Sequence, residues 1–217
     1  MEKYLIDIGD LETIQKKSRV IYYGINHRVS IKESEYISNQ ELRILLLTRL
    51  EPQKDISTFL RAAQHLSEAQ VPYSAKIYGD GSLRQSLIKE IELRGIENEV
   101  CLEEKVGDVE ALFARADILV LPSIYEGFGL VLLEAAQNNL MILAADNPTV
   151  MEITNASPNL LFPVGDDRRL FEMISMISTD QSKVRENLKA CAEFANKYDA
   201  SIQEYEVSKL YAEVLKK

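Results

Sequence analysis

The sequence predicts an α/β protein: a doubly wound, Rossmann-like parallel sheet of about six strands with helices on both faces, followed by C-terminal helices. Two observations support this fold class. Short apolar runs alternate with amphipathic stretches along most of the 217 residues, and only a few residues connect one stretch to the next. Close alternation of strand and helix produces βαβ units, whose right-handed crossovers place helices on both faces of a parallel sheet.

The first half of the predicted sheet contains three strands and two helices. The apolar run LRILLLT is a buried strand, and the stretch after it repeats apolar residues at helical spacing. A second strand, SAKIYG, is followed by a helix that ends at Gly95, a residue suited to a left-handed helix terminus. In chain order these elements are 42–48, 56–69, 74–79, 83–95 and the short strand 99–103.

The second half continues the alternation and then changes character. Asp108 is a favourable N-cap, and the run DILVLP is apolar almost throughout, as a parallel strand buried on both faces should be. The predicted elements here are helix 108–116, strand 117–122, helix 129–139 and strand 140–145. Three amphipathic helices with no strand after them make up the tail, at 166–178, 182–198 and 201–217.

Composition argues against several classes of function. The net charge of −9 argues against a nucleic-acid partner, because neutralising phosphates requires a basic face. Cys101 and Cys191 are not spaced as a metal-binding pair, and His27 and His65 are expected on a loop surface and a helix surface. No apolar run approaches the roughly 18 residues of a membrane span, and the N-terminus lacks the features of a signal peptide. We therefore expect a cytoplasmic protein with no metal and no cofactor.

The first cluster with chemical potential is TRLEPQKD, between a strand and a helix. Ligands of open α/β sheets bind at the carboxyl ends of the strands, which is where this cluster falls. Arg49 offers a planar fork suited to phosphate oxygens, and Lys54 adds a mobile point charge. A diphosphate at this strand end would meet two cations, but the cluster taken alone favours two solvated charges at a turn, because short charge patterns match easily.

A second cluster, EGFGLVLLE, follows the strand DILVLP and begins a helix. Glycines near the first turn leave its N–H groups open to a polyol or a phosphate. Glu126 and Glu134 bracket the segment, and a carboxylate can accept two hydrogen bonds from vicinal hydroxyls. The alternative is an ordinary helix start, near which an acid is favourable anyway. A third segment, YGDGS, is interpreted as a strand-to-helix turn in which Gly79 and Gly81 permit close backbone approach.

Four segments, TRLEPQKD, YGDGS, ADILVLPSIYEGFGLVLLEA and LLFPVGD, occur in this order along the chain. Together they resemble the C-terminal, donor-binding lobe of retaining glycosyltransferases of family 4, the "group 1" family with the two-lobed GT-B architecture. The hallmark of that family is a Glu-x7-Glu motif, which Glu126 and Glu134 match. The resemblance covers roughly residues 42 to 180, and it implies a nucleotide-diphosphate sugar, UDP- or GDP-linked, as donor substrate.

The resemblance assigns the catalytic roles to three residues. Arg49 and Lys54 match the pair that holds the diphosphate and stabilises the leaving group. Glu126 matches the first glutamate, which touches the donor sugar near its reacting centre. In such a reaction the acceptor hydroxyl attacks the sugar from the face that the diphosphate leaves, and lysine and arginine take the place of a metal.

Further donor-binding residues follow from the same match. The loop whose backbone amides meet sugar hydroxyls and phosphate corresponds to Gly127, Phe128, Gly129 and Leu130. Glu134 matches the second glutamate, which binds the ribose hydroxyls. The segment KVGD, 105–108, falls where the family lines the base pocket, and AADNPTVMEI, 144–153, departs from the family's glycine-rich turn.

The resemblance also implies a division of the chain. Residues 1–41 are expected to be a residual N-terminal segment and interdomain link, 42–198 the donor-binding domain, and 199–217 a bracing helix. The acceptor-binding lobe is expected to be missing. We therefore expect the chain to bind the donor and to turn over poorly by itself. Acceptor glycans or lipid-linked sugars of surface polysaccharide synthesis, and peripheral membrane association, would involve that lobe.

Three alternatives remain open at this point. The chain can be a non-catalytic nucleotide-sugar-binding module or subunit that pairs with a separate acceptor-lobe chain. A nucleotide-sugar epimerase of GT-B architecture would share the same donor lobe. A dinucleotide-dependent oxidoreductase would share the fold, but the Gly-x-Gly-x-x-Gly fingerprint is absent from the sequence.

Overall fold

The computed structural model describes residues 18–26, 41–104 and 107–215. They belong to two compact units. The larger unit comprises His27–Lys197, and the smaller combines Met1–Asn26 with Tyr198–Lys217. Most of the predicted N-terminal segment and interdomain link, 1–41, lies outside the described residues. His27 and the first two residues of the KVGD segment, Lys105 and Val106, also lie outside them.

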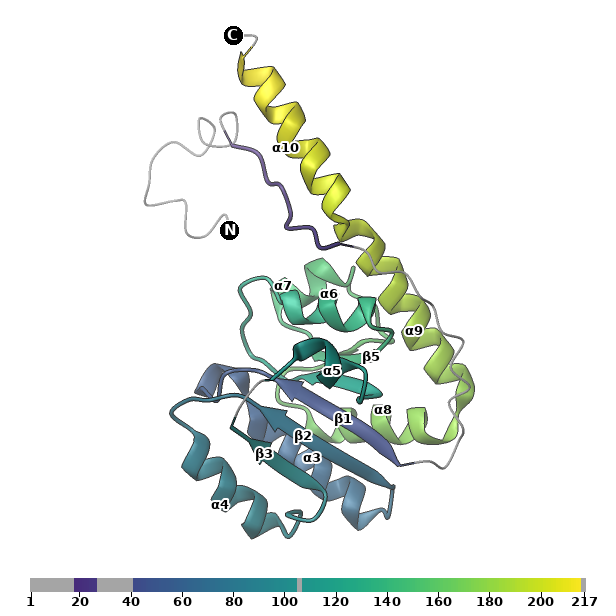
Figure 1. Cartoon of the computed structure of the whole chain (residues 1–217). Coiled ribbons are helices and arrows are strands. Elements are labelled where there is room, and N and C mark those ends of the chain that lie inside the picture. The colour runs from purple at the N-terminus through teal and green to yellow at the C-terminus, as the bar shows by residue number, and fades with distance from the viewer. Residues whose placement is uncertain (1–17, 27–40, 105–106, 216–217) are drawn as a thin grey trace. The chain divides into compact units, whose positions relative to one another are not determined.

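The larger unit is built on one six-stranded, all-parallel sheet with the order β3-β2-β1-β4-β5-β6 (Figure 1). The strands are β1 Leu42–Leu47, β2 Tyr73–Tyr78, β3 Val100–Glu103, β4 Ile118–Leu121, β5 Met141–Ala145 and β6 Leu161–Phe162. The order reverses between β1 and β4, so the loops after these two adjacent strands diverge and leave a crevice at their carboxyl ends. The predicted doubly wound, Rossmann-like fold class is confirmed.

Helices cover both faces of this sheet, as the handedness of the crossovers requires. On one side α3 Ile56–Glu68 packs against α4 Arg84–Arg94 and α8 Asp167–Thr179. On the other side α6 Leu130–Gln137 packs against α9 Gln181–Ala195, which also contacts β5. The short α5, Val109–Phe113, connects β3 to β4. All residues of β4 and β5 are buried, so these strands form the centre of the core.

Two elements were missing from the sequence-based assignment. Helix α7, Pro148–Ile153, occupies the segment that departs from the family's glycine-rich turn. The sequence carries two signals for the start of this helix, an asparagine at the N-cap and a proline at the first helical position. In the structure the Asn147 side chain accepts a hydrogen bond from the Val150 amide at 3.1 Å. Strand β6 has only two residues, which is too short to produce a periodic pattern.

A buried asparagine fixes α9 to the sheet beside the first part of β5, because β6 pairs only with Ala144 and Ala145 at the end of that strand. The Asn187 side chain accepts from the Ile142 amide at 2.9 Å and donates to the Ile142 carbonyl at 2.8 Å. Its amide also donates to the Asn159 carbonyl at 2.8 Å. The side chain thus replaces a neighbouring strand and satisfies backbone groups that would otherwise be buried without partners.

The smaller unit consists of residues 18–26, η2 at its boundary (Asn196–Tyr198), and α10, Ala200–Leu215. Ile25 forms an isolated parallel bridge with Asp199, and Tyr22 packs edge-on against Tyr198. None of the described α10 residues is buried, and its exposed apolar side chains are Ile202, Tyr205, Tyr211, Val214 and Leu215. Among the described helices, none is long and apolar enough to span a bilayer.

Candidate functional site

The loop after β1 brings the first predicted pair of cations to the crevice. Arg49 is exposed directly after the strand, and the 3-10 helix η1, Pro52–Lys54, carries Lys54 at its end. Lys54 is only 9% exposed, which is unusual for a lysine and requires a partner. The loop is tied to the one after β4 by a hydrogen bond of 2.9 Å from the Ile124 amide to the Gln53 carbonyl.

The loop after β2 supports the loop after β1 from below. The Leu50 amide donates to the Asp80 carbonyl, and the Leu83 amide donates to the Leu50 carbonyl, both at 2.9 Å. This packing explains the glycines, because a Cβ at Gly79 would lie 1.8 Å from the Thr48 carbonyl oxygen. A Cβ at Gly81 would lie 2.5 Å from the Leu50 carbonyl oxygen. The predicted role of both glycines in a close-packed turn is confirmed.

The loop after β4 supplies the partner of Lys54. Glu126 is 8% exposed, and its Oε1 accepts a hydrogen bond from Lys54 Nζ at 2.6 Å. The Glu126 carbonyl in turn accepts from the Thr149 hydroxyl at 2.9 Å, and the Asn147 amide group donates to the Ser123 carbonyl at 2.9 Å. A buried ion pair therefore joins the loops after β1 and β4, and α7 holds the second loop in place.

Helix α6 begins at the same crevice from a left-handed residue. Gly129 has φ 77° and ψ 41°, and no side chain caps the first turn. The first amide groups of α6 are consequently not occupied by a capping side chain, which is the arrangement in which a helix N-terminus can meet an anion or a hydroxyl.

These loops enclose a pocket of about 270 Å³ at the carboxyl edge of β1 and β4. Its lining includes six of the predicted site residues, namely Arg49, Lys54, Glu126, Phe128, Gly129 and Leu130. Two predicted residues do not line it: Gly127 is exposed in the loop, and Glu134 is half-buried further along α6. Four further wall residues are apolar or neutral, namely Leu47, Thr48, Leu121 and Val131.

The pocket is locally cationic in an acidic protein. Its lining holds two cationic side chains, Arg49 and Lys54, and one carboxylate, Glu126. Since the ion pair neutralises Lys54, the guanidinium of Arg49 is left as the surplus charge. Glu51 lies nearby, and hydrogen bonds from the Ser82 amide and hydroxyl, with a smaller contribution from the charge of Arg49, lower the pKa of its carboxyl. The part of the chain that the structure describes has no cluster of three or more potential metal ligands.

His65 is not the solvated helix-surface residue that the sequence suggested. Its Nε2 lies 3.1 Å from Asp167 Oδ2, and its ring packs against Phe171 with a centroid distance of 5.8 Å. The misinterpretation arose because the partners lie on α8, far away in the sequence. Of the KVGD segment, Asp108 is described as the N-cap of α5, where it accepts hydrogen bonds from the Glu110 and Ala111 amides.

Fold and site together define a class: a Rossmann-like α/β protein with a pocket at the point where its strand order reverses, lined by two cationic side chains and one carboxylate. Comparison with known proteins specifies the family. The family model described as "Glycosyl transferases group 1" matches residues 28–197. The chain therefore belongs to the group 1 glycosyltransferase family.

Two curated relatives illustrate the similarity. An uncharacterized glycosyltransferase of Methanocaldococcus jannaschii is 31% identical over 162 residues, covering 68% of this chain and 41% of the relative. A GalNAc-alpha-(1->4)-GalNAc-alpha-(1->3)-diNAcBac-PP-undecaprenol alpha-1,4-N-acetyl-D-galactosaminyltransferase of Campylobacter jejuni is 29% identical, covering 81% of this chain and 49% of the relative. The chain thus spans a little under half the length of these relatives.

Solved structures share the fold at lower sequence identity. A glycosyltransferase from Rickettsia africae aligns with a TM-score of 0.78 at 18% identity, over 99% of this chain and 61% of that one. The pneumococcal O-GlcNAc transferase GtfA, solved in complex with UDP and GlcNAc, aligns with a TM-score of 0.77 at 17% identity, over 99% of this chain and 44% of that one. These likenesses establish the GT-B-type fold of the described domain.

Proposed function

We propose that this chain is the donor-binding half of a retaining, family 4 glycosyltransferase. It would bind a UDP- or GDP-linked sugar and serve its transfer to a glycan or lipid-linked acceptor. One observation carries the proposal: Arg49 and the buried Lys54–Glu126 pair, from loops after two different strands, line one pocket at the carboxyl edge of the sheet. The names of two Campylobacter relatives, which describe transfer to undecaprenol-linked sugars, support the acceptor class.

The electrostatic arrangement suits departure of a nucleoside diphosphate. Glu126 holds the Lys54 ammonium at a fixed place before any ligand arrives, so little reorganisation is needed when charge develops on the leaving group. Arg49 is exposed at the pocket and can offer its guanidinium fork to phosphate oxygens. The uncapped first turn of α6 adds backbone donors. In this proposal the protein stabilises the leaving diphosphate with cations and amides from its own chain.

The two glutamates have different places in the proposal. Glu126 lines the pocket and would contact the donor sugar near its reacting carbon once the diphosphate is bound to Lys54. Glu134 would reach the ribose hydroxyls from outside the present pocket lining. A UDP-complexed solved neighbour has the same fold, which makes UDP the first nucleotide to test.

Calorimetric titration with UDP and with GDP tests the diphosphate site. Arg49→Ala and Lys54→Ala are each expected to lower the affinity for the nucleotide by about ten- to a hundredfold, because each removes a charge-assisted contact. Lys189→Ala is a matched control, since that side chain is 78% exposed on α9 and away from the pocket residues. Affinities that stay unchanged in both Arg49→Ala and Lys54→Ala would contradict the assignment of the site.

Product analysis then separates transfer from the alternatives. Incubation of the nucleotide sugar with the chain alone would yield an epimerised nucleotide sugar if the protein were an epimerase. Addition of an undecaprenol-linked acceptor, together with a separately expressed acceptor lobe, should yield a glycosylated lipid if the chain is half of a transferase. Binding of the donor with no product under either condition would favour a non-catalytic binding module.

A further inference from the structure

The residue after Lys54 has an unusual backbone conformation. Asp55 has φ 43° and ψ 46°, in the left-handed region that residues with a Cβ avoid and that Asn and Asp tolerate best. It is also the N-cap of α3, a position that normally has an extended backbone and a side chain that caps the first turn. The Asp55 carboxylate makes no such capping hydrogen bond. Its side chain is committed to a different contact.

That contact is with a buried threonine one turn along the helix. Thr58 Oγ1 donates to Asp55 Oδ2 at 2.5 Å, and the Thr58 amide donates to the Asp55 carbonyl at 3.0 Å. Thr58 is fully buried, so its hydroxyl has no access to water as an alternative partner. The side chain and the backbone of Asp55 are therefore both held by Thr58, and this double contact stabilises the left-handed turn.

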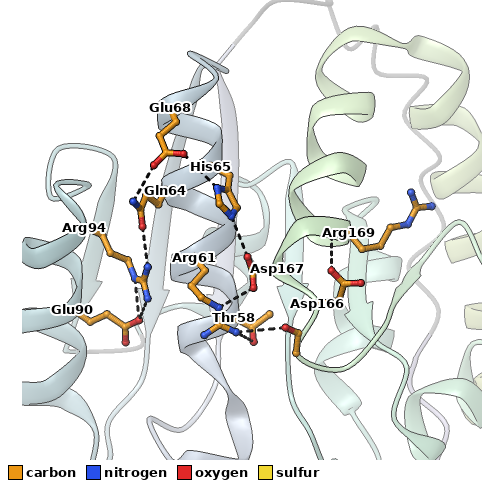
Figure 2. A network of polar contacts seen from close by, with 11 residues as sticks. Thr58, Arg61, Gln64, His65, Glu68, Glu90, Arg94, Asp166, Asp167 and Arg169 are labelled. Carbon is orange, nitrogen blue, oxygen red and sulfur yellow. Dashed lines mark hydrogen bonds and ion pairs between the residues drawn. The ribbon is translucent and has the colours of Figure 1, made fainter.

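The threonine is in turn held by a network that reaches another helix (Figure 2). Arg61 Nη2 donates to Thr58 Oγ1 at 2.8 Å, and Arg61 Nε donates to Asp167 Oδ1 at 2.8 Å. Asp167 is the first residue of α8, and His65 contacts its other oxygen. The arginine orients the hydroxyl of Thr58 toward Asp55, because it occupies an acceptor position on the same oxygen.

We propose that Asp55, Thr58, Arg61 and Asp167 are positioning residues that fix Lys54 in the pocket. The peptide bond between Lys54 and Asp55 joins the end of η1 to the N-cap of α3. The backbone dihedral angles of Asp55 therefore set the direction in which Lys54 projects. The chain of contacts runs from α8 through α3 to that peptide bond. This inference rests on the proposed role of Lys54 as a ligand of the diphosphate.

The first test uses the ligand-free protein and measures amide hydrogen exchange by NMR. The amides of Lys54, Asp55 and Thr58 are hydrogen-bonded to carbonyls within this turn. Their exchange should accelerate at least about threefold in Thr58→Val and in Arg61→Met, since the turn then opens more often. Thr58→Val preserves the shape of the buried side chain and removes only the hydroxyl.

Arg94→Met is the matched control for Arg61→Met. Arg94 is half-buried like Arg61 and makes similar contacts, to Glu90 at 2.7 Å and Gln64 at 2.9 Å, but none to Thr58 or Asp167. Exchange in the Lys54–Thr58 turn should be unaffected by this change. Equal acceleration in Arg94→Met and Arg61→Met would overturn the positioning role and indicate general loosening of α3.

The second test measures affinity for UDP and GDP in the same variants. Thr58→Val and Arg61→Met should each lower the affinity for the nucleotide about three- to tenfold, whereas Arg94→Met should leave it unchanged. In a Lys54→Ala background, Thr58→Val should cause no further loss, because the residue that it positions is gone. Asp55→Asn, which tolerates the left-handed turn and keeps an acceptor for Thr58, should bind nearly as the wild type does, in contrast to Asp55→Ala.

The two tests separate this inference from the proposed function. If the wild type binds neither nucleotide, the proposed function fails, and hydrogen exchange alone decides whether the four residues hold the turn. If the wild type binds and Thr58→Val weakens binding equally with and without Lys54, the positioning role is wrong while the binding site stands.

Discussion

Helices α3 and α6 begin at neighbouring places in the crevice and solve the same conformational problem in different ways. Both start from a left-handed residue, Asp55 before α3 and Gly129 before α6. Glycine adopts this conformation without steric cost, so the start of α6 depends on a single residue. Aspartate needs outside support, which comes from Thr58 and from a network that ends on α8. The comparison teaches that two equivalent backbone turns can depend on very different amounts of the surrounding protein.

The loop before α3 is packed tightly against neighbouring backbone, whereas the loop before α6 is more open. Two glycine substitutions that probe this difference in packing give the largest expected contrast in stability. Gly79→Ala should destabilise the protein by about 3 kcal/mol, because the added Cβ would meet the Thr48 carbonyl oxygen at 1.8 Å beneath the loop before α3. Gly127→Ala should leave the free energy of unfolding within about 0.5 kcal/mol of the wild type, because a Cβ added at this position has no neighbouring atom within 4 Å. Urea unfolding measures both, and similar losses would contradict the difference in loop packing.

The ion pair that joins the two loops gives the next largest effect. Lys54→Met leaves Glu126 buried without its partner and should cost about 2–3 kcal/mol of stability. The double variant Lys54→Met, Glu126→Met should lose less than the sum of the two single variants, since no charge is then left unpaired. Additive losses in urea unfolding would show that the two side chains do not stabilise each other.

The sequence predicted what local patterns and short motifs determine. The alternation of apolar runs located five strands, and TRLEPQKD and EGFGLVLLE placed Arg49, Lys54 and Glu126 on loops that do meet at one pocket. The direct contact of Lys54 with Glu126 was not predicted, because the two residues are 72 positions apart and no spacing rule connects them. The motif also could not show that Glu134 lies outside the pocket lining, since a motif gives order along the chain but not side-chain direction.

The remaining omissions are long-range or very short. The sequence did not single out Thr58, Arg61 or Asp167, because their interactions join α3 to α8 across 106 positions. Glycines could be recognised as turn residues by type, whereas the left-handed conformation of Asp55 leaves no mark in the composition. The two-residue β6 is shorter than any pattern, and its role in covering β5 is shared with the side chain of Asn187.

Reciprocal substitutions at the two helix starts should have effects of opposite character. Gly129→Ala should destabilise the protein by about 1–2 kcal/mol, because alanine has no side chain that stabilises the left-handed region. Asp55→Gly should change stability by less than about 1 kcal/mol, because relief of the backbone offsets the lost contact with Thr58. Thermal unfolding gives both values. A loss at Asp55→Gly as large as that at Gly129→Ala would mean that the carboxylate contact dominates the turn.

The smallest expected effect is a pH dependence of stability at one of the two helix starts. Only the start of α3 is connected to Asp167, through Thr58 and Arg61. Burial raises the pKa of Asp167, but the hydrogen bond and charge of Arg61, with a further hydrogen bond from His65, outweigh it and hold the pKa below the ordinary value of 3.8. A carboxyl with a depressed pKa adds stability above its unfolded pKa and loses it as the pH falls through the folded value.

The difference in unfolding free energy between the wild type and Asp167→Asn should therefore be nearly constant down to about pH 5 and should shrink toward pH 3. We expect it to stay below about 1 kcal/mol, because the pair is partly exposed and screened. The same comparison in an Arg61→Met background should show little pH dependence, since the main group that lowers the pKa is then absent. If the pH dependence persists without Arg61, Asp167 is stabilised by another group, and the connection from α8 to the turn at Asp55 is weaker than the structure indicates.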